Sequence, residues 1–345
     1  MAAAARRRVR ALAGEAHVTL VVFIVAAALS LAASAVLVTR LERLGERLGA
    51  PEAILGLAAA LAADSPEIAT AIAAVARGQR DIGVGVVLGS NVFNLAALLG
   101  LSAVIAGRIA LHRRVVLLEG AVAVWIALMA LLTVTRVTAP GLGLALSLVA
   151  FVPYVVVSAV PPRDRVRLPL PGPARRWLAE AVDEEEAELL AAIHPPRGRW
   201  SDAAIAGAAL AVVVAASAVM ESRGSMIGTQ FGLASIVVGG ILLAAVTSLP
   251  NAVAAVYLAR RGRSSATLSE ALNSNALNAM VGFMIPAVVV GVGRETGGGL
   301  LTAWWYAGLT LVTLGFAYVG SGLGRRAGAV VITLYLVFVV VLIRL

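Results

Sequence analysis

Two short stretches of the chain decide how it folds, because each places a proline and polar side chains inside an apolar segment. They read Ala63-Asp64-Ser65-Pro66-Glu67 and Thr247-Ser248-Leu249-Pro250-Asn251. Each is followed by a glycine, Gly78 or Gly262, and then by a polar run, Gly89-Ser90-Asn91-Val92-Phe93-Asn94 or Asn273-Ser274-Asn275-Ala276-Leu277-Asn278. A single offset of 184 residues, Pro66 to Pro250, superposes the two sets without a gap. The chain therefore contains an internal duplication.

The composition indicates that this duplication lies in a membrane. Of the 345 residues, 60% are hydrophobic and only 14% are charged, which is more apolar surface than a globular core buries. A helix needs about 20 residues to cross the hydrocarbon layer. The sequence predicts ten such segments: Val18–Thr39, 52–76, 81–107, 115–135, 139–160, 203–221, 229–259, 266–292, 300–320 and 327–344. The apolar runs do not alternate with period two, which excludes a porin-like barrel. We predict an all-α polytopic membrane protein, which excludes a soluble enzyme and a DNA-binding protein.

A polar segment, residues 161–202, divides the ten predicted spans into five and five. We therefore predict a first five-helix repeat (1–160), a linker loop (161–202) and a second five-helix repeat (203–345). Because each half has five spans, the second repeat must enter the membrane with the opposite orientation to the first. This is the geometry of inverted repeats.

Basic residues indicate the orientation of the spans. All 28 are arginine; the loops after the odd-numbered spans hold 18 of them, and the other side, termini included, holds 10. The positive-inside bias predicts a cytoplasmic linker and both termini outside, in a bacterial-type plasma membrane. The net charge of +9 is thus interpreted as orienting helices. The expected partners are the lipid bilayer and small cations, not nucleic acid, and no oligomeric state is indicated.

The sequence offers few groups for covalent chemistry. It has no cysteine, and its three histidines, His17, His112 and His194, lie at or beyond the edges of the predicted spans. An intramembrane aspartyl protease needs two facing acids, and Asp64 and Glu67 on one kinked helix would face each other poorly. An intramembrane serine protease would lack a histidine within the membrane. No phosphate-binding loop indicates an ATP-driven pump. We therefore expect no enzymatic activity and no cofactor.

The proline stretches predict an ion site near the middle of the membrane. A proline inside a helix frees the carbonyl four residues earlier, and at this depth protein or a water-filled cavity must satisfy it. A carboxylate within a span, such as Asp64 or Glu67, normally faces a partner or a cavity. No arginine lies in the middle of a span, so the partner is a cation or a proton.

Hard cations such as Ca²⁺ and Na⁺ take oxygen ligands. The two stretches and the polar runs that follow them supply the candidates, which are Glu67, Asp64, Asn91, Asn251, Asn275, Ser90, Thr247, Ser248 and Ser274. For Asn94 and Asn278, one turn further on, simple hydrogen bonding between helices explains the amides equally well.

These motifs resemble the α-repeats of the cation/Ca²⁺ exchanger superfamily. In its sodium/calcium branch each half carries Gly-Thr-Ser-Leu-Pro-Glu followed by Gly-Ser-Asn-(apolar)-Phe-Asn. This chain matches the first element at Thr247-Ser248-Leu249-Pro250 and at Pro66-Glu67, and the second at Gly89-Ser90-Asn91-Val92-Phe93-Asn94. The resemblance implies a ten-span secondary antiporter that exchanges Ca²⁺ for Na⁺ or H⁺ through a midplane site by alternating access. It also implies that Glu67, at the family's acidic position, is the main ligand.

The chain departs from the family pattern at its acids. Asp64 stands where the family has serine, and Asn251 where it has a carboxylate, so both acids lie on one helix. The two negative charges match one Ca²⁺. Two close carboxylates also suit the exchange of protons, which favours H⁺ as the counter-ion. The pair Thr247-Ser248 resembles the ligands of the sodium branch, which favours Na⁺. Two alternatives stay open: the same fold carrying Mg²⁺ or a monovalent cation with protons, or a transport-inactive homologue acting as a membrane partner subunit.

Overall fold

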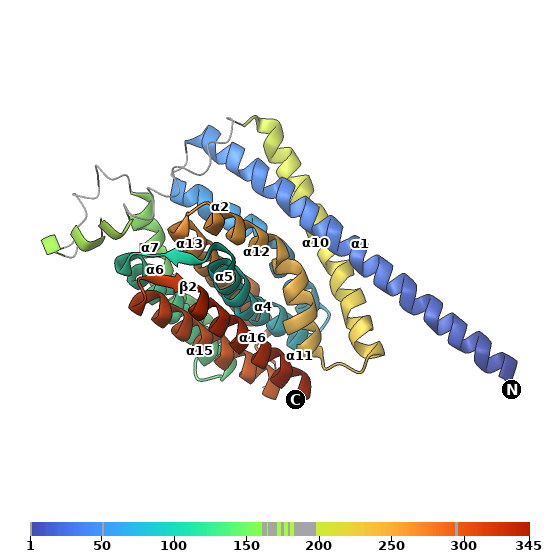
Figure 1. Cartoon of the computed structure of the whole chain (residues 1–345). Coiled ribbons are helices and arrows are strands. Elements are labelled where there is room, and N and C mark those ends of the chain that lie inside the picture. The colour runs from blue at the N-terminus through green and yellow to red at the C-terminus, as the bar shows by residue number, and fades with distance from the viewer. Residues whose placement is uncertain are drawn as a thin grey trace.

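The structure, a computed structural model, is a bundle of helices crossing one another in a single body (Figure 1). It describes residues 2–49, 52–160, 198–293 and 296–345, with the shorter pieces 164, 171–173, 176–178 and 180–182. Most of the predicted linker, residues 161–202, lies outside the described residues.

The described elements follow the order expected for two five-span halves. In the first half they are α1 (Ala2–Leu48), α2 (Glu52–Ala63), α3 (Ser65–Ala76), α4 (Arg80–Asn94), the π-helical η1 (Leu95–Leu101), α5 (Ser102–Ala106), β1 (Arg108–Ala110), α6 (Arg113–Val134) and α7 (Pro140–Ala159). In the second half they are α10 (Trp200–Gln230), α11 (Ser235–Val237), η2 (Val238–Leu243), α12 (Ala244–Arg260), α13 (Ser264–Leu277), η3 (Asn278–Met284), α14 (Ile285–Val290), α15 (Gly297–Val319), β2 (Gly322–Gly324) and α16 (Arg325–Arg344).

The prediction of ten spans is confirmed for the described residues. Nine continuous helical segments are long and apolar enough to cross a membrane, and the bent pair α2–α3 makes a tenth. Two spans are longer than predicted: the first runs over Ala16–Leu48 and the sixth over Trp200–Gln230. Both belong to the long helices α1 and α10, which pack along one another (Figure 1).

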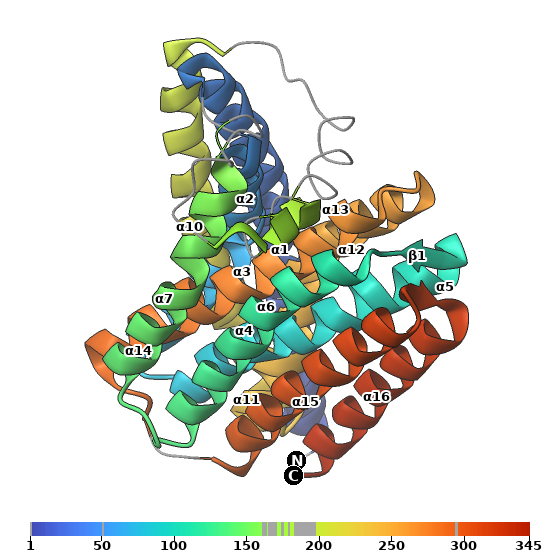
Figure 2. The same cartoon turned by 90° about the vertical axis from the view of Figure 1, so that its left-hand side faces the viewer.

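Contacts at the helix ends show that the spans alternate in direction. We call the side where the chain enters and leaves residues 161–202 the linker side. There β1 and β2 pair antiparallel (Figure 2), and Arg40 near the end of α1 forms an ion pair with Asp202 at the start of α10, at 2.7 Å. On the opposite side, Arg77 after α3 forms an ion pair with the buried Glu221 of α10.

The duplication read from the sequence recurs in the backbone. Helices α4 and α13 begin at residues related by the offset of 184, Arg80 and Ser264, and both pass into a π-helical segment. The turns before them carry Gly78 and Gly262 with φ of 77° and 75°, left-handed values that glycine adopts without strain. The two halves therefore share local geometry as well as sequence.

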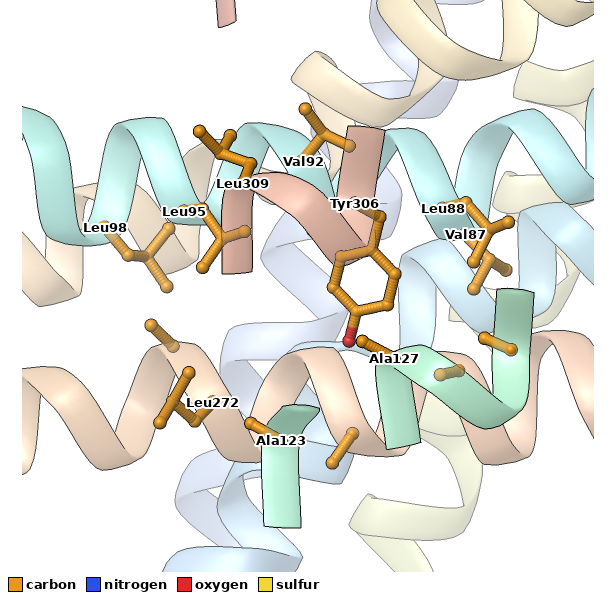
Figure 3. Packing of buried hydrophobic residues seen from close by; sticks show 14 of the residues in the cluster. Val87, Leu88, Val92, Leu95, Leu98, Ala123, Ala127, Leu272, Tyr306 and Leu309 are labelled. Carbon is orange, nitrogen blue, oxygen red and sulfur yellow. The ribbon is translucent and has the colours of Figure 1, made fainter. Parts of the chain in front are cut away.

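Helix α4 is the centre of the bundle. Its span, Arg80–Ala106, is the most buried of the candidate spans. Tyr306 of α15 is buried beside α4, and its ring points toward Ala127 of α6 (Figure 3). This apolar packing holds the two repeats together around the polar runs described below.

Glycines allow α4 to approach η2 backbone to backbone. A Cβ built on Gly89 would lie 2.5 Å from both the Cα and the carbonyl oxygen of Gly240. Gly85 is nearly as close, since its Cβ would lie 2.8 Å from the Gly240 amide nitrogen. Side chains here would force the two helices apart.

We expect Gly89→Ala to lower the thermal unfolding midpoint in detergent. Overpacking a tight contact typically costs about 1–3 kcal/mol, and here the nearest neighbours are backbone atoms that cannot rotate away. Gly308→Ala in α15 is the matched control, because nothing lies within 4 Å of its Cβ position. Equal midpoints for the two variants would show that the α4–η2 contact yields easily.

Candidate functional site

The first polar stretch forms a sharp break between two helices. Helix α2 ends at Ala63 and α3 begins at Ser65, with a bend of 52° at Asp64. The carbonyl oxygen of Ala62 accepts hydrogen bonds from the hydroxyls of Ser34, at 2.8 Å, and Ser65, at 2.6 Å. These hydroxyls satisfy backbone that the break frees, as the position of Pro66 predicts.

The second polar stretch behaves differently. Helix α12 continues through Pro250, whereas the sequence predicts a break at both prolines. The Thr247 hydroxyl bonds to carbonyls of the preceding turn, Leu243 at 3.0 Å and Ala244 at 3.2 Å, and stays within its own helix. The helix therefore breaks in the first repeat only, whereas the carbonyl four residues before each proline, that of Ala62 or Val246, loses its helical amide donor in both repeats because proline has no N–H.

The two acids of the first repeat are fully buried and are held by the second repeat. Asp64 Oδ1 accepts hydrogen bonds from Asn251 Nδ2, at 2.7 Å, and from Ser274 Oγ, at 2.8 Å. The carboxylate of Glu67 accepts one from the Ser248 hydroxyl and one from Asn278 Nδ2, at 3.4 Å. The two carboxyl groups also lie close enough to interact directly.

The asparagines after each glycine meet across the pseudo-twofold axis. Asn91 Nδ2 donates to the backbone oxygen of Asn275 at 3.0 Å, and Asn275 Nδ2 donates to the backbone oxygen of Asn91 at 3.1 Å. This reciprocal pair is what an offset of 184 and opposite orientation predict. Asn94 Nδ2 adds bonds to Asn275 Oδ1, at 3.0 Å, and to Ser274 Oγ, at 3.2 Å.

Several buried oxygens at this site have no hydrogen-bond partner within the described part of the chain. They are Asp64 Oδ2, Ser90 Oγ, Asn91 Oδ1, Asn94 Oδ1 and Asn278 Oδ1. Leaving a buried polar atom unpaired costs about 1–3 kcal/mol, so native structures rarely gather five of them. Carboxylate, amide and hydroxyl oxygens are the ligands that hard cations prefer. The arrangement can therefore hold a cation.

The charge of the site points the same way. Among the described residues no arginine forms an ion pair with Asp64 or Glu67. In the same part of the chain no three His, Cys, Asp or Glu side chains gather as a metal-binding group. The site thus has two carboxylates and a shell of neutral oxygens, and two negative charges suit one divalent cation or a smaller cation with a proton.

The structure brings together seven of the nine candidates from the sequence. Asp64 and Glu67 contact Asn251, Ser248 and Ser274, while Asn91 and Asn275 bond to each other beside Asn94 and Ser274. Ser90 is buried next to Asn91. Thr247 is buried as well, but its hydroxyl faces its own helix.

Asn278 is the site residue that the sequence left undecided. It donates to Glu67 at 3.4 Å. The available signal was its spacing of four residues from Ser274, since residues i and i+4 share one face of a helix.

Two curated proteins are similar in sequence to this chain. The chain is 26% identical over 256 residues to "Putative antiporter CaxA" of Alkalimonas amylolytica, covering 72% of each chain. It is 23% identical over 251 residues to the inner membrane protein YrbG of Escherichia coli (strain K12), covering 70% of each.

Solved structures share the fold. The H⁺/Ca²⁺ exchanger CAX superposes with a TM-score of 0.68 at 13% identity, covering 94% of this chain and 86% of that one. The sodium–calcium exchanger NCX_Mj gives a TM-score of 0.59 at 17% identity, covering 94% and 99%. At such identities the likeness shows the fold alone.

The resemblance drawn from the proline and asparagine motifs is also confirmed by a family model. The model described as sodium/calcium exchanger protein matches residues 18–160 and 202–344, one segment in each half of the chain. The chain is an integral membrane protein that belongs to the sodium/calcium exchanger protein family.

Proposed function

We propose that this protein is a secondary antiporter that carries Ca²⁺ through the Asp64–Glu67 site by alternating access, with H⁺ as the counter-ion. The candidate residues other than Thr247, together with Asn278, line the path of the cation near the middle of the membrane. The central loop faces the cytoplasm of a bacterial-type plasma membrane, and both termini face outside.

One observation carries this proposal: among the described residues, two fully buried carboxylates lie against each other, accept hydrogen bonds from neutral side chains and pair with no arginine. Ionising both in a region of low dielectric is costly unless positive charge is added. A divalent cation supplies that charge in one state of a transport cycle, and protons supply it in the other. Competition for the same carboxylates couples the two fluxes.

The choice of H⁺ over Na⁺ rests on where the acids lie. Both are on the α2–α3 segment. The second repeat contributes the neutral Asn251 and Asn278, and holding several sodium ions at once would need further negative charge there. The feature of the sequence that favours sodium is the Thr247-Ser248 pair; its Thr247 hydroxyl is bonded to its own helix, and its Ser248 hydroxyl donates to Glu67. Sodium coupling is therefore the second candidate.

Flux in proteoliposomes tests the proposal. Vesicles with an acidic interior should accumulate Ca²⁺, and a proton ionophore should abolish the accumulation. An outward Na⁺ gradient at clamped pH should drive little uptake. Uptake that follows the Na⁺ gradient and ignores the ionophore would establish sodium coupling instead. Mg²⁺ and a monovalent cation are run in parallel, because the same fold could carry either.

The remaining alternative, a transport-inactive partner subunit, predicts no flux of any of these ions. Thermal stability of the purified protein then separates a protein without a site from one that binds and does not transport. A ligand that binds only the native state raises the unfolding midpoint with concentration. If the wild-type protein shows no Ca²⁺ flux and no Ca²⁺-dependent rise in its unfolding midpoint, the proposed function is contradicted.

A further inference from the structure

The two ends of the ion site are packed differently, although the repeats are related by one offset. On the side away from the linker, η2 and α11 pack tightly on α4 through Gly85, Gly89 and Gly240. The equivalent pair on the linker side is α2 with α13, and it makes far fewer contacts. Likewise α10 packs closely on α3, whereas its counterpart α1 barely contacts α12.

Side-chain exposure follows the same asymmetry. Val86 of α4 is 0% exposed, whereas the residue at the equivalent position of α13, Glu270, is partly exposed. Ala59 of α2 is half-buried, and its equivalent Leu243 is 0% exposed. The α4–η2 interface is thus packed more tightly than its counterpart, the α2–α13 interface on the linker side.

Glu270 lies on the face of α13 that carries the site. It precedes Ser274 by four residues and Asn278 by eight, so all three share one face of the helix. Ser274 donates to Asp64 and Asn278 to Glu67. Because α13 begins on the linker side, Glu270 is one turn further out than Ser274.

The charges around Glu270 are acidic on both sides. Asp64, deeper in the protein, and Glu42, near the linker-side end of α1, both lie close enough to interact with it. Within the described residues no arginine forms an ion pair with Glu270. At the inner end, Asp64 Oδ2 is fully buried and has no hydrogen-bond partner in that part of the chain. A line of three acids thus leads from the linker side to an oxygen suited to a cation.

We propose that Glu270 is a linker-side station for the transported cation, which holds Ca²⁺ briefly between the aqueous phase and Asp64. A carboxylate in the mouth of a low-dielectric passage raises the local cation concentration. The fold does not require a charge here, since the equivalent position in the first repeat holds the buried Val86. The proposal rests on the proposed function and adds a residue to its pathway on one side only.

The test compares the apparent KM for Ca²⁺ on the two sides of the membrane, in vesicles sealed with the linker side out or in. Glu270→Gln should raise the linker-side KM about fivefold, through loss of a nearby charge, and leave the KM on the opposite side within twofold. Glu270→Asp keeps the charge and should stay near wild type. Asp81→Asn, in the first turn of α4 at the opposite end, is the matched control and should leave the linker-side KM unchanged.

Each result is decisive when the unfolding midpoints of the variants match that of wild type. An unchanged linker-side KM in Glu270→Gln, or an equal rise on both sides, would overturn the role of Glu270 while wild-type flux upholds the proposed function. Absence of Ca²⁺ flux in wild-type vesicles would instead contradict the proposed function itself.

Discussion

Glu67→Gln is expected to abolish Ca²⁺ transport, with a fall of about a hundredfold or more, because removing one partner of a buried charge pair typically costs about 3–5 kcal/mol. Glutamine keeps the shape of the side chain; its Oε1 can accept from Asn278 while its Nε2 donates to the Ser248 hydroxyl oxygen. The variant should therefore fold, and only the compensation of a divalent charge is lost. Flux and Ca²⁺-dependent thermal stabilisation are the two measurements.

The thermal measurement separates a lost site from a lost fold. Without Ca²⁺, Glu67→Gln should unfold at the same temperature as wild type or higher, because it relieves the repulsion between adjacent buried carboxyl groups. With Ca²⁺, the midpoint should rise in wild type and stay constant in the variant. Glu180→Gln makes the same chemical change in an exposed ion pair with Arg114 and should leave both measurements unaltered. Wild-type flux in Glu67→Gln would show that another group holds the cation.

Much of the fold and part of the site could be read from the sequence. The offset of 184 residues predicted that the two halves meet around corresponding polar groups, and the reciprocal hydrogen bonds between Asn91 and Asn275 confirm it. Repetition is informative here because it fixes the relation between two distant segments. The number of spans followed from length and apolarity alone.

The details that the sequence could not predict depend on helix rotation and continuity. Thr247 and Ser248 are neighbours on α12, about 100° apart around its axis, so only one of them can face Glu67. Ser248 does, and Thr247 bonds to its own helix. The break at Asp64 and the continuous helix at Pro250 differ through tertiary hydroxyls such as that of Ser34, which lies on another helix. Residue types alone do not show which oxygen will reach which carbonyl.

The other large expected effect on Ca²⁺ flux concerns Asp64, the second acid of the site. Asp64 and Asn251 face each other across the two repeats, with Oδ1 and Nδ2 only 2.7 Å apart. Removing the carboxylate at position 64 and adding one at position 251 therefore moves a negative charge by a short distance within one site. Asp64→Ser should lower Ca²⁺ flux about a hundredfold, because one carboxylate cannot match a buried divalent cation.

Adding Asn251→Glu to Asp64→Ser should restore flux to within about tenfold of wild type, since neighbouring substitutions that share one function are strongly non-additive. The double variant carries its two acids on opposite repeats, as the sodium/calcium branch does. Flux is measured under a pH gradient and, separately, under a Na⁺ gradient. Because the two acids then lie on different repeats, the share of the Ca²⁺ flux that the Na⁺ gradient drives should be larger than in wild type. A double variant as inactive as Asp64→Ser would show that Asp64 acts through its position at the break between α2 and α3 rather than through its charge.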